Sequence, residues 1–143
     1  MAITQRYAGK RALFDDRKFN FGDVWILSDE LITIPQADGT NTRKLHSERW
    51  VVITSNNVEN YHPLCPIVTV SPLSHVVELA KEFDLELLPN TDNVKDKSLL
   101  QIKLMQPILK KDLATCKGPI SEIKKVELQV LLEDFLGLAE ADV

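Results

Sequence analysis

The stretch of residues 49–70, RWVVITSNNVENYHPLCPIVTV, carries the clearest strand pattern in the sequence. Two parts of it, Arg49-Trp-Val-Val-Ile-Thr54 and Ile67-Val-Thr-Val70, are almost continuously apolar. Short apolar runs bounded by turn residues are typical of strands that are buried on both faces. The residues between them, Ser55 to Pro66, have turn chemistry. We therefore predict two buried strands joined by an irregular connection.

Further strands are expected on both sides of this pair. Residues 21–27 form a glycine-containing run of β-branched and aromatic residues, and residues 83–87 alternate between apolar and polar. Residues 99–105 predict another strand, and Pro107 places its end at an edge or exit of the sheet. Residues 28–47 read as a long connection, although residues 31–34 could instead extend a hairpin arm that turns at Asp38-Gly39.

The C-terminal segment changes to helical periodicity. Ser121 is a candidate N-cap, and Gly137 lies where a C-cap glycine is expected. The apolar positions recur at helical spacing and are Ile120, Ile123, Val126, Leu128, Val130, Leu131, Leu132 and Phe135. Such a stripe favours a helix packed on the sheet, with partner binding as the alternative. The pattern as a whole predicts an α+β fold with a mainly antiparallel sheet of about five strands.

Composition excludes several classes of protein. The 143 residues suit a single domain, and the net charge of −4 disfavours tight nonspecific binding to nucleic acid. We assign residues 1–20 to an N-terminal arm and residues 21–143 to one domain. No apolar run is long enough to cross a bilayer, and the N-terminus lacks an apolar signal core, so we expect a cytoplasmic protein with no membrane contact. Two isolated cysteines, Cys65 and Cys116, and the lack of zinc or phosphate-loop motifs predict neither a metal nor a cofactor.

Several segments together resemble the MazF/PemK toxin family. Gly22-Asp-Val-Trp25 is similar to the family's first strand, and Arg49-Trp-Val-Val-Ile53 to its R-P-V-(V/L)-V-I strand. The other matching segments, in the same order as in the family, are Asn57-Val-Glu-Asn60, Ile67 to Ser74, Ser98, Leu104 to Ile108 with Lys110, Gly118-Pro-Ile-Ser121 and Leu136-Gly-Leu138. The resemblance runs from about residue 21 to residue 138, and the shared order of the segments carries its weight.

This resemblance implies an SH3-like small β-barrel with flanking helices, including a long C-terminal one. It also implies a homodimeric toxin that cleaves single-stranded RNA without a metal ion and is neutralised by an antitoxin protein. The family's catalytic arginine and threonine fall on Arg49 and Ser74. The sequence departs from the family pattern at Trp50, where proline is usual, at Ser74 itself, and at Gln106, where arginine is common.

The proposed pair can be tested against strand geometry. If residues 49–54 and 66–71 pair antiparallel, Arg49 and Ser74 lie at the same end of the sheet. A guanidinium fits phosphate oxygens with two parallel hydrogen bonds, and a hydroxyl donor can stabilise charge developing on the phosphorus oxygens. His75, His46 and Glu48 are the candidates for general acid or base.

Binding of RNA requires cations and aromatic surfaces along a groove. Arg43 and Lys44 precede the catalytic arginine and are candidate phosphate contacts, although such charge pairs are commonly solvated. Trp50 is a candidate RNA contact, with a place in the core as the alternative. Two other functions stay open because a fold does not fix a chemistry: a noncatalytic toxin that binds a protein target, and a nucleic-acid-binding module.

Overall fold

The two apolar runs form neighbouring antiparallel strands, β2 (Arg49–Ile53) and β3 (Ile67–Ser74), in the computed structural model. The structure describes residues 15–35, 45–76 and 82–138. Val51 pairs with Pro72, and this register brings the start of β2 beside the end of β3. The connection between the strands contains one helical turn, α2 (Asn57–Asn60). The antiparallel pairing assumed in the sequence analysis is therefore confirmed.

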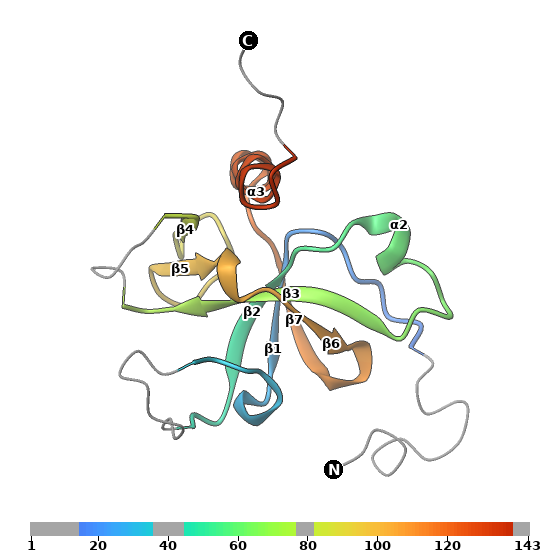
Figure 1. The fold of residues 1–143 in the computed structure, drawn as a ribbon. Coiled ribbons are helices and arrows are strands. Elements are labelled where there is room, and N and C mark those ends of the chain that lie inside the picture. Colours follow the sequence, from blue (N-terminus) through green and yellow to red (C-terminus); the bar gives the residue numbers. More distant parts are fainter. Residues whose placement is uncertain (1–14, 36–44, 77–81, 139–143) are drawn as a thin grey trace.

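The remaining strands extend this pair into a seven-stranded antiparallel sheet (Figure 1). On one side, β1 (Asp23–Leu27) pairs with β2, and β7 (Leu113–Pro119) pairs with β1. On the other side, β3 pairs along its first half with β6 (Gln106–Leu109) and at its end with β5 (Ser98–Gln101), which also pairs with β4 (Asp84–Leu87). In the described residues β4 and β7 remain edges, so the sheet coils but is not closed.

The α+β class is confirmed, but the strand count differs from the expected five. The predicted strand over residues 99–105 ends at Gln101 and is followed by a short 3₁₀ helix, Ile102–Leu104. Pro107 lies inside β6 rather than after a strand, opposite Thr69, on a strand that pairs only with β3 among the described residues. β7 was not predicted from the sequence. Most of its side chains are exposed, so its sequence lacks the alternation of apolar and polar residues that indicates a strand.

The core has two parts, one on each face of the central strands. Val51 and Ile53 of β2 belong to the first part, together with Trp25, whereas Val52 belongs to the second. All three β2 residues are fully buried. The continuously apolar sequence of this strand is thus explained, because both of its faces are covered, as predicted.

The C-terminal helix, α3 (Glu122–Phe135), begins and ends at the predicted residues. The Ser121 hydroxyl accepts a hydrogen bond from the Lys124 amide. Gly137 has a φ of +72°, and the Gly137 and Leu138 amides bond to the carbonyls of Asp134 and Glu133, which is a Schellman motif. No helix among the described residues is long and apolar enough to span a bilayer.

Only one face of α3 packs on the sheet. Leu128 is fully buried in the second part of the core, and Leu131, Leu132 and Phe135 pack against it. A second stripe, formed by Ile123, Val126 and Val130, is 71%, 62% and 51% exposed. The prediction of a helix packed on the sheet is correct for the first stripe, and the second faces solvent.

The end of the N-terminal arm packs into the first part of the core. Phe19 is fully buried and stacks on Trp25 with 4.8 Å between ring centroids. The Arg17 guanidinium donates hydrogen bonds to the Asp15 carboxylate and to the carbonyls of Lys110 and Leu113. Residues 15–19 therefore fasten the short connection between β6 and β7. The division of the chain at residue 20 stays a prediction.

Candidate active site

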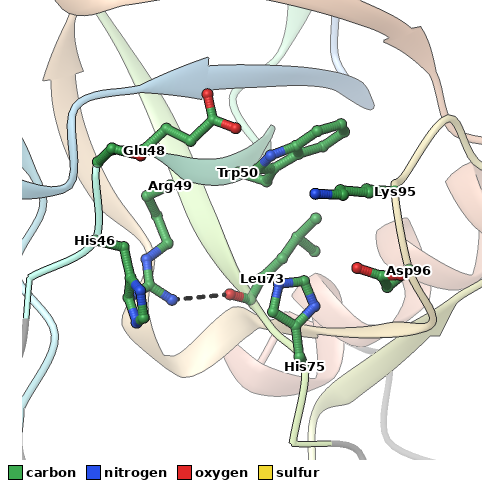
Figure 2. A pocket seen from close by; sticks show the side chains of 9 residues that line it. His46, Glu48, Arg49, Trp50, Leu73, His75, Lys95 and Asp96 are labelled. Atoms are coloured by element: carbon green, nitrogen blue, oxygen red, sulfur yellow. Dashed lines mark hydrogen bonds between the residues drawn. The ribbon is translucent and has the colours of Figure 1, made fainter.

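Arg49 lies at the first position of β2 and is held by contacts on two sides. Its Nε donates to Oδ1 of Asp29 at 3.0 Å, and its Nη1 donates to the Leu73 carbonyl at 3.3 Å (Figure 2). The Arg49 side chain is 18% exposed, whereas Asp29 is completely buried. Because these bonds occupy two of the five guanidinium N–H groups, the others can bind a ligand anion.

Asp29 comes from residues 28–47, for which the sequence predicts a long connection. It lies in a 3₁₀ turn, Asp29–Leu31, and its Oδ2 also accepts a hydrogen bond from the His46 amide at 2.8 Å. Beyond this turn, Ile32 is buried in the core, and the Gln106 side chain bonds to both backbone groups of Thr33. Residues 32–35 form no strand, and the alternative hairpin turn at Asp38-Gly39 lies outside the described residues.

Ser74 lies at the last position of β3, beside the start of β2. The pairing of β2 with β3 ends at Val51 and Pro72, two residues short of Arg49 and of Ser74. The hydrogen bond from Arg49 to the Leu73 carbonyl keeps Ser74 close to the start of β2. The half-buried Ser74 hydroxyl accepts a hydrogen bond from the Val76 amide at 3.2 Å. This is a turn-capping contact, and it leaves the hydroxyl proton available to another acceptor.

A cavity of about 200 Å³ opens beside the Arg49 guanidinium. Its lining contains five of the residues singled out from the sequence and four others: His46, Ser47, Glu48, Arg49, Trp50, Leu73, His75, Lys95 and Asp96. Figure 2 shows His46 on the Arg49 side, Lys95 and Asp96 on the opposite side, and the Glu48 carboxylate turned away from the guanidinium. The fold thus places His46 and His75 at the same cavity as Arg49, whereas Glu48 lines the cavity with its carboxylate directed away from the guanidinium.

One described site residue, Ser74, does not line this cavity, and two others cannot be placed in it. Ser74 is absent from the lining although its neighbours Leu73 and His75 are part of it, as expected when successive strand residues point to opposite faces. Arg43 and Lys44 lie outside the described residues. Trp50 is half-buried against the core and also lines the cavity, so its contact with RNA stays a prediction.

Sequence reasoning missed Asp29, Lys95 and Asp96. Asp29 precedes a short apolar run without periodicity, and nothing in the sequence indicates that it reaches Arg49. Lys95 and Asp96 follow a turn-rich stretch in which charged residues are ordinarily solvated. Within the described residues, no group of three or more His, Cys, Asp or Glu side chains is arranged to hold a metal ion.

Comparison with known proteins identifies the architecture. No family model and no curated protein matches the sequence. An endoribonuclease in complex with its cognate antitoxin from a mycobacterial species superposes with a TM-score of 0.61 at 14% identity, covering 87% of this chain and 99% of that one. The fold is that of the MazF toxins.

Two further structures support this assignment. The MazF-mt6 toxin of Mycobacterium tuberculosis has a TM-score of 0.61 at 17% identity over 82% of this chain and 99% of its own. MazF in the MazE–MazF complex of Deinococcus radiodurans has a TM-score of 0.60 at 13% identity over 87% and 100%. The MazF fold implied by the sequence resemblance is therefore present, and the candidate active site lies within it.

Proposed function

We propose that this protein is a MazF-like endoribonuclease toxin that cleaves single-stranded RNA at selected sequences and is neutralised by an antitoxin. The observation that carries the proposal is the Arg49 guanidinium, fixed by a buried carboxylate at a cavity that also holds two histidines. Two of the solved structures with this fold are complexes with an antitoxin, MazE in one case. The location that goes with this proposal is the cytoplasm, where the proposed RNA substrate would be met.

The reaction we propose is attack of the ribose 2′-oxygen on the adjacent phosphorus, which breaks the bond to the 5′-oxygen. One group must take the 2′-hydroxyl proton, and another must protonate the leaving oxygen. His46, His75 and Glu48 line the cavity and can fill these roles. Arg49 neutralises charge on the phosphate oxygens, and the Ser74 hydroxyl donates to one of them. Arg43, Lys44 and Trp50 are the proposed RNA contacts.

Cleavage of a long single-stranded RNA in EDTA tests this function. We expect fragments that carry 5′-hydroxyl ends, and no cleavage by Arg49→Ala. Arg49→Lys keeps the charge but loses the planar fork, so it should retain only a small fraction of the rate. Ser74→Ala should lose about 10²–10³ in rate and Ser74→Thr little. Intact RNA at high protein concentration, or full activity of Arg49→Ala, would contradict the proposal.

A noncatalytic binding toxin is the second candidate. It is favoured by one observation, the hydrogen bond that engages the Ser74 hydroxyl as a turn cap outside the cavity lining. A protein of this kind would arrest growth while leaving RNA intact. Arg49→Ala distinguishes the two candidates in cells. If the variant loses both growth arrest and RNA cleavage, the result supports the nuclease and not the noncatalytic toxin.

We also propose that the protein forms a homodimer through the exposed stripe of α3. Ile123, Val126 and Val130 are spaced three and four residues apart and so share one helix face. Contiguous exposed apolar side chains of this kind commonly mark protein interfaces.

A further inference from the structure

The loop between β4 and β5 presents two charged side chains to the cavity from a fixed backbone. Before them, the fully buried Asp92 carboxylate accepts hydrogen bonds from the Leu88 amide at 2.8 Å and the Ser121 amide at 2.9 Å. Asn93 donates from its side chain to the Pro119 carbonyl at 2.5 Å, and Val94 is buried in the core. The loop is therefore fastened to the chain that precedes α3.

The other side of the charged pair is fastened as well. The buried Ser98 hydroxyl donates to the Asp96 carbonyl at 2.7 Å, and Lys97 forms an ion pair with Glu86 of β4 at 3.6 Å. Between these anchors, the Lys95 ammonium and the Asp96 carboxylate are exposed, and neither has a hydrogen-bond or ion-pair partner in the part of the chain that the structure describes. A fixed backbone that carries charged groups without partners suits ligand binding. Little conformational entropy of the loop is lost when a ligand binds, because the backbone is already ordered.

Trp50 adds an aromatic surface to the same cavity. The Lys117 ammonium lies 5.4 Å from its ring centroid, and the indole packs on the second part of the core, so the ring is supported. Figure 2 shows Lys95 beside the indole and Asp96 between Lys95 and His75. Proline is usual at this position in the family that the sequence resembles, so this aromatic surface distinguishes the present chain from the family pattern.

We propose that Trp50, Lys95 and Asp96 form a subsite that selects a guanine base beside the scissile phosphate; this inference rests on the proposed RNA cleavage. An ionised carboxylate only accepts hydrogen bonds, and its two oxygens suit two adjacent donors. Guanine offers two such donors, N1–H and the N2 amino group, next to the O6 acceptor, which the Lys95 ammonium can bind. Unpaired bases are commonly stacked on aromatic side chains and bound along this edge.

The other bases fit this arrangement less well. Adenine and cytosine each place a ring-nitrogen acceptor beside their amino group, and that acceptor would face the Asp96 carboxylate unfavourably. Uracil offers a single N–H between two carbonyls. A good bidentate contact discriminates between bases by about ten-fold or more in affinity.

Binding and cleavage must be measured separately to test the subsite. For binding, the probes are 2′-O-methyl oligouridylates that carry guanine, adenine, cytosine or uracil at one position, since a methylated 2′-oxygen cannot attack. We expect the guanine probe to bind the full-length protein about ten-fold more tightly than the others. For cleavage, sequencing of fragment ends from a long RNA should show guanine enriched at one position beside the cut.

The variants are chosen to keep the fold. Asp96→Asn replaces one acceptor by donors and should abolish the guanine preference in both measurements, while Trp50→Phe should keep the preference and weaken binding of every probe. Glu59→Gln, the same carboxylate-to-amide change at an exposed side chain of α2 outside the cavity lining, is the matched control and should behave as wild type. Equal binding of the four probes, absence of binding, or an Asp96→Asn variant that still prefers guanine would overturn the subsite. Guanine-selective binding without any RNA cleavage would instead overturn the proposed nuclease function.

Discussion

At the scale of single residues, Asp29 controls how Arg49 can act. The Asp29 carboxylate is fully buried and bonds to both the Arg49 guanidinium and the His46 amide. Burying an isolated carboxylate costs free energy of folding, and the charge of Arg49 offsets this cost. Asp29 in turn fixes the direction of the guanidinium. Because the same carboxylate holds the backbone at His46, it positions two of the groups that surround the cavity.

Asp29→Asn is therefore expected to impair cleavage more than folding. The amide keeps the size of the side chain but removes its charge and one of its two acceptors, so Arg49 loses its orientation. We expect kcat in RNA cleavage to fall by about ten-fold or more, and the free energy of unfolding by about 1–3 kcal/mol. Single-turnover cleavage and denaturant unfolding measure the two effects.

Ser28→Ala is the matched control for this prediction. Ser28 precedes the same 3₁₀ turn, and its side chain forms no capping hydrogen bond. Both the rate and the stability should stay at the wild-type level. Wild-type cleavage by Asp29→Asn would show that Arg49 needs no positioning by this carboxylate.

At the scale of elements, Asp92 joins the β4–β5 loop to the start of α3. Burial alone would raise the pKa of the Asp92 carboxyl, but the hydrogen bonds from the Leu88 and Ser121 amides outweigh burial and hold this pKa below its ordinary value. A pKa that is lower in the folded chain than in the unfolded chain makes the fold more stable above the unfolded pKa. This stabilisation is lost as the pH falls through the folded pKa.

Asp92→Asn should remove this dependence on pH. At pH 7 we expect the variant to lose about 1–3 kcal/mol in the free energy of unfolding, because the amide cannot accept all of these bonds as well as a carboxylate does. As the pH falls below the ordinary aspartate pKa of about 3.9, the difference from wild type should narrow, since proton binding then favours the unfolded wild-type chain. Urea unfolding between pH 2 and pH 7 measures both quantities.

Asp96→Asn provides the comparison for this pH series. It makes the same chemical change in the same loop, at an exposed side chain without a partner in the described residues. Its stability curve should follow that of the wild type. A constant gap between Asp92→Asn and wild type at all pH values would contradict the role assigned to the Asp92 charge.

At the scale of the whole molecule, the stripe of α3 is an exposed apolar surface that burial against a partner would stabilise. Ile123, Val126 and Val130 form this stripe on the helix face opposite the one that packs on the sheet. Figure 1 shows α3 standing at the outside of the molecule, above the sheet. A second copy of the chain would cover the stripe and add its own apolar residues to the contact.

Val126→Glu should convert the proposed dimer to monomer. It places one charge per protomer in an apolar contact, and we expect the dimer dissociation constant to rise at least about 100-fold. Sedimentation equilibrium measures the change. Val58→Glu, the same substitution at a valine of α2 that is 81% exposed, should leave the dissociation constant unaltered. A wild-type protein that sediments as a monomer at high concentration would refute the proposal.

The sequence by itself determined the features that depend on local pattern. The apolar run of β2 implied burial on both faces, and the Ser121 cap and Gly137 fixed the ends of α3, because each signal lies within a few residues of its effect. The positions of Arg49 and Ser74 at one end of the sheet followed from antiparallel pairing alone.

Tertiary structure alone decided which side chains meet. Asp29 reaches Arg49, and Lys95 and Asp96 face the cavity, through contacts between segments distant in sequence, which no local periodicity encodes. β7 is a strand because β1 offers it a partner, although its exposed side chains carry no strand pattern. Local preferences act over one turn or one strand, whereas a site is assembled by strand register and loop anchoring across the whole sheet.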